Sequence, residues 1–79
     1  EIKSNDPGTD KKLYNSASAP ISSANIGGLI TLSGPSTPAN VTYTANATGG
    51  VVTFTGPFAT GDYTVNINSN AIKNKSGIS

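Results

Sequence analysis

The chain contains no cysteine, histidine, methionine, tryptophan or arginine. Without cysteine, neither a disulfide framework nor a thiolate metal site can support a small core. Without histidine and arginine, the chain lacks the commonest general base and the planar side chain that binds phosphates in a bidentate manner. A serine or threonine hydroxyl is a poor nucleophile until a base takes its proton. We therefore predict that the protein is not an enzyme.

Charged residues are also scarce. They make up 11% of the chain, and five lysines against four acidic residues leave a formal net charge of +1. The lysines lie near the two ends of the sequence and form no basic stripe, which argues against nucleic-acid binding by counterion release. No apolar run approaches the roughly 18 residues of a membrane span. We predict no nucleic-acid partner and no insertion into a membrane.

The length of the chain, 79 residues, is enough for one small domain and too short for two. Leu, Ile, Val and Phe together supply 16 residues, so the core must be small, while the low net charge favours folding over disorder. Serine, threonine and asparagine supply 29 residues, which predicts a polar but weakly charged surface. We expect residues 1–79 to form a single domain. Because the first residue is Glu1, we expect this domain to be excised from a larger multidomain protein.

Alternating side chains predict β-strands in the second half of the chain. Residues 41–45 and 51–55 alternate apolar residues with threonine, and the glycines of residues 46–50 suit a hairpin loop between them. Residues 63–67 alternate in the same way and predict a third strand. Period-two alternation places one set of side chains inward. The predicted inward residues are Val41, Tyr43, Ala45, Val52, Phe54, Tyr63, Val65 and Ile67.

Weaker patterns predict further short strands upstream, at residues 2–4, 13–19 and 29–32. Residues 22–25 and 69–72 can each form one helical turn, and no longer helix is predicted. Turn signals recur about every eight to twelve residues between these strands, which is typical of an all-β sandwich or a small barrel. With six or seven strands, an antiparallel β-sandwich is our first interpretation, and a five-stranded barrel is the alternative.

The order of these pieces from Lys11 onward resembles the bacterial Ig-like domains that are repeated in S-layer and other bacterial cell-surface proteins. Residues 13–21 look like the family's early strand, which ends in a small residue, a proline and a branched aliphatic residue. The later matching segments are residues 30–32 (the next strand), 41–54 (the central hairpin), 58–67 (the penultimate turn and closing strand) and 71–77 (the ending). The opening, residues 1–10, is shorter than the family usually shows, and the Ig-type disulfide and tryptophan are absent.

This resemblance implies an Ig-like antiparallel β-sandwich of about six or seven short strands, with an extracellular, non-catalytic role. The implied function is a structural or spacer module of a bacterial cell-surface protein, in an S-layer or cell wall, where tandem domains form a stiff array or lattice. The implied partners are neighbouring domains of the same protein and further copies that assemble laterally. The alternative, of a different class, is a binding module: an adhesin or carbohydrate-binding Ig-like domain, or a decoration domain of a phage virion.

Asp6 and Asp10 are the candidate metal ligands, with Asn5 and Asp62 as further oxygen donors of the kind that calcium prefers. S-layer Ig-like domains as a class use calcium at module junctions, so the resemblance implies calcium as the one conceivable cofactor. The spacing over residues 5–10 does not match the twelve-residue helix–loop–helix calcium loop. The same residue types favour turns, so turn formation is our first interpretation and calcium binding is the alternative.

Three tyrosines, Tyr14, Tyr43 and Tyr63, are candidates for an aromatic platform that binds sugars. Such a platform requires the three rings to face outward together. Tyrosines in alternating strands more often lie in the core with the hydroxyl at its rim, so core packing is the first interpretation.

Overall fold

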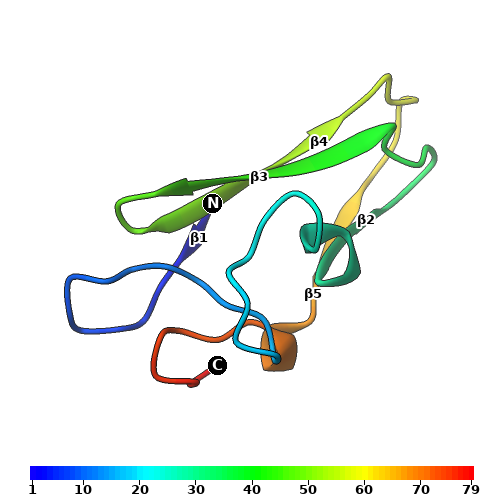
Figure 1. The fold of residues 1–79 in the computed structure, drawn as a ribbon. Coiled ribbons are helices and arrows are strands. Elements are labelled where there is room, and N and C mark those ends of the chain that lie inside the picture. The colour runs from blue at the N-terminus through cyan, green and yellow to red at the C-terminus, as the bar shows by residue number, and fades with distance from the viewer.

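The computed structural model describes residues 1–79 and contains two antiparallel sheets (Figure 1). One sheet has the strand order β1-β4-β3 and the other has the order β2-β5. The elements in chain order are β1 (Ile2–Lys3), the 3-10 turn η1 (Ile26–Gly28), β2 (Ile30–Ser33), β3 (Asn40–Asn46), β4 (Gly49–Thr55), β5 (Thr64–Ile67) and the 3-10 turn η2 (Ser69–Ala71). The all-β class is confirmed, and the arrangement is consistent with a β-sandwich. It has five strands rather than the predicted six or seven.

Most of the predicted short elements are present. β1, β2 and β5 lie at the predicted segments 2–4, 29–32 and 63–67, and η2 lies at the predicted turn 69–72. The other predicted turn, at residues 22–25, is also present, since the Asn25 and Ile26 N–H groups donate to the Ser22 carbonyl at 3.2 and 2.9 Å, and it leads directly into the 3-10 turn η1. None of the helical turns is long and apolar enough to cross a membrane.

The central hairpin forms where the alternation predicts it. β3 and β4 pair from Asn40 opposite Thr55 to Asn46 opposite Gly49. The loop is shorter than predicted, since only Ala47 and Thr48 lie between the paired ends, and the Asn46 side chain accepts a hydrogen bond from the Thr48 N–H at 2.9 Å. Both glycines of the predicted loop therefore belong to β4.

Gly49 lets β1 lie close to β4. Its φ is +149°, and a Cβ at this position would be 2.2 Å from the carbonyl oxygen of Ile2. Ile2 pairs with Gly50 and Lys3 pairs with Gly49, and the Ser4 N–H donates to the Thr48 carbonyl at 2.8 Å. Gly49 thus permits the close contact between β1 and β4, two strands that are far apart in sequence.

Gly50 leaves room for the ring of Tyr43. A Cβ at Gly50 would lie 2.2 Å from that ring, and the Tyr43 hydroxyl donates a hydrogen bond to the Gly49 carbonyl at 3.0 Å. Tyr43 itself is half-buried and packs against the core. Burial raises the pKa of the Tyr43 hydroxyl. The first interpretation, a tyrosine packed inward with its hydroxyl at the rim, is confirmed for this residue.

We expect Tyr43→Phe to reduce the loss of stability at alkaline pH. The folded state holds the phenol proton more tightly than the unfolded state, whose tyrosine pKa is about 10. Below about pH 10 both states are protonated and stability is full, whereas above it the unfolded state ionises first and stability falls as the pH rises through the folded pKa. At neutral pH the variant should lose only about 1 kcal/mol, for one hydrogen bond. Urea denaturation of both proteins at neutral and strongly alkaline pH measures this, and an identical alkaline loss in both would contradict it.

The most buried side chains come mainly from outside the strands. The core cluster contains Leu13, Ile21, Ile26, Ile30 and Ile72, of which only Ile30 belongs to a strand. Ile26, in η1, is fully buried at 0% exposure. Half-buried strand residues pack against this cluster, namely Ile2, Val41, Tyr43, Val52 and Phe54. The core therefore lies between the strands and the loops and 3-10 turns that pack against them.

The prediction that Val65 and Ile67 are buried is wrong. Both line a gap between the sheets together with Val52 and Phe54, as the alternation predicts, yet they are 52% and 56% exposed. Ile2 of β1 borders the same gap, and β1 pairs only with the start of β4. Ala45, also predicted to lie inward, is exposed as well.

The strand predicted at residues 13–19 is not formed. Tyr14 takes part only in isolated bridges, and the chain turns at Ser18, whose φ is +63°. The Asn15 side chain accepts hydrogen bonds from the N–H groups of Ala17 and Ala19, at 2.9 and 3.0 Å. An asparagine that satisfies nearby backbone amides in this way competes with a sheet ladder. Leu13, at the start of this segment, is buried, with 6% of its surface exposed.

Candidate functional site

The two candidate calcium ligands lie in the loop that follows β1 (Figure 1). Asp6 is buried, and its Oδ1 accepts a hydrogen bond from the Gly8 N–H at 2.7 Å. The backbone carbonyl of Asp6 accepts another from Lys11 Nζ. Asp10 Oδ1 accepts one from the Lys12 N–H at 3.0 Å. Both carboxylates therefore stabilise turns, as the first interpretation predicts.

The structure does not gather all four oxygen donors. Asp62 lies in the turn before β5, and that turn is far from the loop after β1 that contains Asp6 and Asp10 (Figure 1). Asn5 is next to Asp6, but its side chain hydrogen-bonds to Asn74 and to the Ser79 backbone. No group of three or more acidic, histidine or cysteine side chains is close enough to hold a metal ion. Calcium binding at Asp6 and Asp10 stays a prediction.

The three tyrosines do not form one platform. Tyr14 bridges to Lys73 near the chain's C-terminal segment, and Tyr43 lies on the hairpin against Gly50. Tyr63 lies just before β5, where its hydroxyl donates to the Ala59 carbonyl at 2.6 Å. Each ring belongs to a different part of the fold.

A smaller aromatic pair was not predicted from the sequence. Phe58 and Tyr63 stack edge to face, with ring centroids 5.5 Å apart and an angle of 74° between the rings. Phe58 is 43% exposed, and both rings border an open apolar space of about 390 Å³ together with Leu32 and Phe54. The sequence does carry a signal for this pair. The two aromatic residues lie on either side of the turn at residues 59–62, and a tight turn brings its flanking residues close together.

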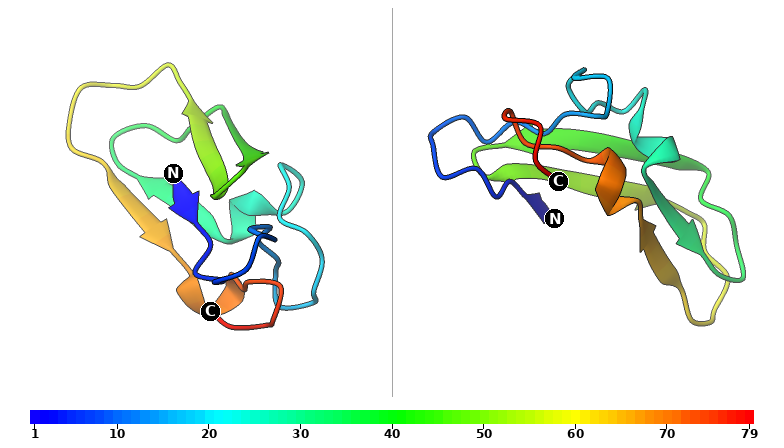
Figure 2. Two further views of the ribbon diagram at one scale, coloured as in Figure 1. Left: turned by 90° about the vertical axis from the view of Figure 1, so that its left-hand side faces the viewer. Right: turned by 90° about the horizontal axis from the view of Figure 1, so that it is seen from below.

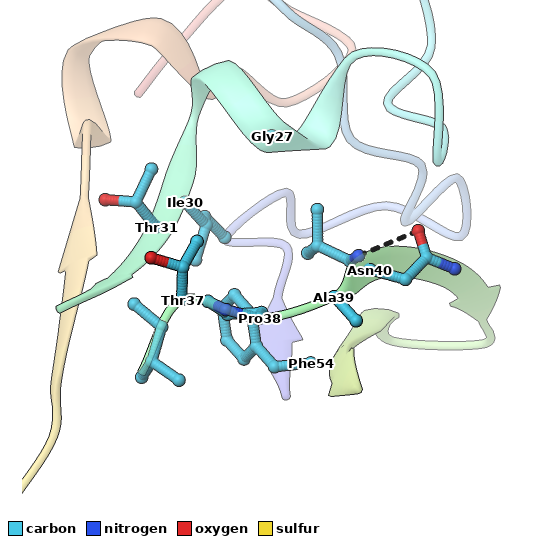
Figure 3. A pocket seen from close by; sticks show the side chains of 10 residues that line it. Gly27, Ile30, Thr31, Thr37, Pro38, Ala39, Asn40 and Phe54 are labelled. Atoms are coloured by element: carbon cyan, nitrogen blue, oxygen red, sulfur yellow. Dashed lines mark hydrogen bonds between the residues drawn. The ribbon is translucent and has the colours of Figure 1, made fainter. Parts of the chain in front are cut away.

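An apolar groove of about 490 Å³ opens between the two sheets (Figure 3). Ile30 and Phe54 line it from opposite sheets, and residues 37–39 run along one side. The Asn40 side-chain oxygen, at the rim, accepts a hydrogen bond from the Val41 N–H at 3.0 Å. The lining residues are Gly27, Ile30, Thr31, Leu32, Thr37, Pro38, Ala39, Asn40, Val41 and Phe54, none of them charged. The groove can accept an apolar group and offers hydroxyl and amide groups at its margin.

β5 forms a free edge of the smaller sheet. It pairs with β2 on one side only, and all four of its residues are exposed. Figure 2 shows β5 at the side of the molecule with no strand beyond it. The edge of β3 differs, because the Ser23 hydroxyl both accepts from the Tyr43 N–H at 2.9 Å and donates to its carbonyl at 3.4 Å. β5 is thus a surface on which another strand can add.

No family model, curated protein or solved structure matches this chain.

Proposed function

We propose that this domain is an Ig-like, non-catalytic structural module: a spacer in an extracellular bacterial cell-surface protein that contributes to an S-layer-like array or lattice. The observation that carries the proposal is the pairing of β2 with β5 around the β3–β4 hairpin, which belongs to the other sheet. Strands that are not consecutive in sequence pair in this way in sandwiches with two facing sheets. The Ig-like resemblance of residues 13–77 supports the same reading.

The surface chemistry also supports a role in a dense array. The exposed threonines of the hairpin, Thr44, Thr53 and Thr55, present hydroxyl groups rather than charges. With a net charge of +1, copies of the domain repel one another only weakly, so they can pack side by side. The molecule is elongated, 41 × 21 × 20 Å, which gives it long lateral faces for such packing.

The proposed location is tested by labelling intact cells that express the parent protein. We expect an antibody raised against the folded domain to bind non-permeabilised cells, and immunogold particles to be regularly spaced. Protease treatment of the intact cells should remove the signal, while a cytoplasmic protein probed in parallel should survive. Labelling that appears only after permeabilisation would contradict the proposal.

A second candidate function, a carbohydrate-binding or adhesin module, is favoured by the exposed pair of Phe58 and Tyr63. Aromatic rings that border an open space suit sugar faces, and Phe58 is the more accessible ring. A glycan array separates the candidates. A spacer gives no saturable signal, whereas a binding module gives one that Phe58→Ala abolishes and Val51→Ala, a change at an exposed residue of β4, leaves intact.

A further inference from the structure

The free edge of β5 is only four residues long, but it carries no charged residue, no proline and no bulge of the kinds that often protect such edges. Edge strands of soluble proteins are usually blunted by lysine, proline, a bulge or a covering loop, because their unpaired backbone groups invite another strand. β5 has the sequence Thr-Val-Asn-Ile, with no charge and no proline, and its register with β2 is regular over all four residues. It is therefore open to pairing.

The backbone groups on this free edge belong to the two apolar residues. The Asn68 N–H donates to the Leu29 carbonyl at 2.9 Å, and this pair continues the β2–β5 register by one residue. Hydrogen-bonded and non-hydrogen-bonded pairs alternate in an antiparallel ladder, so Asn66 and Thr64 bond to β2 and the residues between them do not. The N–H and C=O groups of Val65 and Ile67 consequently point away from β2.

The side chains of the same two residues are exposed. Val65 and Ile67 are 52% and 56% exposed and lie beside Val52 and Phe54 in an open space of about 310 Å³ between the sheets. A strand added to β5 would satisfy the free backbone groups and cover these apolar side chains at the same time. Both observations concern one edge and point to one kind of occupant, an extended strand.

We propose that the occupant is β5 of a second copy of this chain, paired antiparallel about a two-fold axis at Asn66. In this register Val65 lies opposite Ile67 of the other copy, in both directions, and Asn66 lies opposite Asn66. The two β2-β5 sheets join into one four-stranded sheet with the order β2-β5-β5-β2. This contact rests on the array function proposed above and specifies how neighbouring copies touch.

The sequence of β5 is complementary to itself in this register. Val65 lies opposite Ile67 and Asn66 lies opposite Asn66, so apolar side chains can pack together and amides can hydrogen-bond, and cross-strand contacts between directly opposite side chains stabilise antiparallel strands. No charge is brought near a like charge, since residues 63–72 contain no charged residue. In the register centred on Asn66, Val65, Asn66 and Ile67 pair only with one another, and Thr64 lies opposite Asn68 of the other copy, whereas moving the register by two residues would place Tyr63 or Ser69, which lie outside β5, opposite one of the two apolar residues.

The contact is weak for an isolated pair of molecules. A standard stable interface covers about 800 Å² on each partner, and the whole surface of this molecule is 4807 Å². One four-residue edge falls well short of that standard area. Weak contacts become effective when tethering holds copies at high local concentration, as neighbours in an array are.

Cysteine cross-linking captures such a weak contact and suits a chain with no cysteine of its own. Asn66→Cys would place two cysteines opposite each other in a non-hydrogen-bonded pair, where the Cα atoms are about 4.5 Å apart and a disulfide can form. We expect the purified Asn66→Cys chain to form disulfide-linked dimers about tenfold faster under mild oxidation than a chain whose cysteine lies away from any edge. The matched control is Thr53→Cys, an exposed position on the central strand β4.

A charge on the edge tests whether β5 itself makes the contact. Adding Val65→Lys to Asn66→Cys should lower the rate to that of the control, because lysine on an edge strand opposes pairing. Adding Val51→Lys, the same change at an exposed valine of β4, should leave the fast rate unchanged. Circular dichroism checks that each variant is folded, and Ile67→Lys replaces Val65→Lys if the latter is not.

Equal rates for Asn66→Cys and Thr53→Cys would overturn the self-pairing, as would a fast rate that Val65→Lys and Ile67→Lys both leave unchanged. Neither result bears on whether the parent protein is on the cell surface. Fast, lysine-sensitive cross-linking together with labelling confined to permeabilised cells would retain the contact and remove the surface role. The two proposals can therefore fail separately.

Discussion

Ile26→Ala should remove a large part of the domain's stability. The Ile26 side chain is the one large side chain that is fully buried, and it packs in the cluster with Leu13, Ile21, Ile30 and Ile72. Truncating a buried isoleucine to alanine lowers the free energy of unfolding by about 2–5 kcal/mol, since it removes apolar burial and leaves a cavity. A domain of this size has about 4–12 kcal/mol in total. We expect the urea midpoint, followed by circular dichroism, to fall by a third or more.

Ile67→Ala is the matched control, because it makes the same chemical change at a residue that is 56% exposed. It should lower the free energy of unfolding by less than about 1 kcal/mol. If the two variants lost equal stability, the core would extend along the strands as the alternation in the sequence predicts, and the open gap beside β5 would be closed in solution.

The pattern of the sequence predicts the hairpin and the inward direction of its side chains. Alternation in residues 41–55 is a local property, and the pairing of β3 with β4 needs only a short turn between neighbouring segments. Burial is not local. Val65 and Ile67 face the other sheet as predicted, but the residues that border the same gap include Ile2 of β1, which is more than sixty residues away in the sequence.

The position of the core was missed for a related reason. Leu13, Ile21 and Ile72 lie in segments without usable periodicity, so no pattern marks them as more buried than strand residues. At residues 13–19, the hydrogen bonds of Asn15 to nearby backbone groups outweigh a weak strand pattern. The turns at Asp6 and Asp10 could be predicted, because each depends on a hydrogen bond between the aspartate side chain and the backbone N–H two residues later, which is a property of the local sequence.

The glycines show how a local rule can give the right residue for the wrong reason. Gly49 and Gly50 were assigned to the hairpin loop because glycine tolerates positive φ. Gly49 does have φ +149°, yet its main constraint is the carbonyl oxygen of Ile2 on the neighbouring strand. The distinction matters because it predicts which part of the fold fails when a side chain is added there.

Gly49→Ala should detach β1. A Cβ would lie 2.2 Å from the Ile2 carbonyl oxygen and 3.0 Å from the Lys3 Cα, and these are backbone atoms that cannot rotate away. The positive φ adds strain for any residue with a Cβ. We expect a loss of about 2 kcal/mol or more, which exceeds the effect of an unstrained glycine substitution. The loss of stability cannot exceed the stability that β1 contributes, because β3 and β4 can stay paired with each other once β1 has moved aside.

Hydrogen exchange distinguishes this local detachment from general destabilisation. In Gly49→Ala, the Ser4 amide, which donates to the Thr48 carbonyl in the native protein, should exchange much faster, while the β3–β4 amides lose protection only in proportion to global stability. Gly28→Ala is the matched control, since a Cβ there meets nothing within 4 Å and its φ is not positive. It should be neutral or slightly stabilising. Retained protection at Ser4 in Gly49→Ala would mean that β1 does not depend on close approach at this glycine, and that the hairpin loop is its real role.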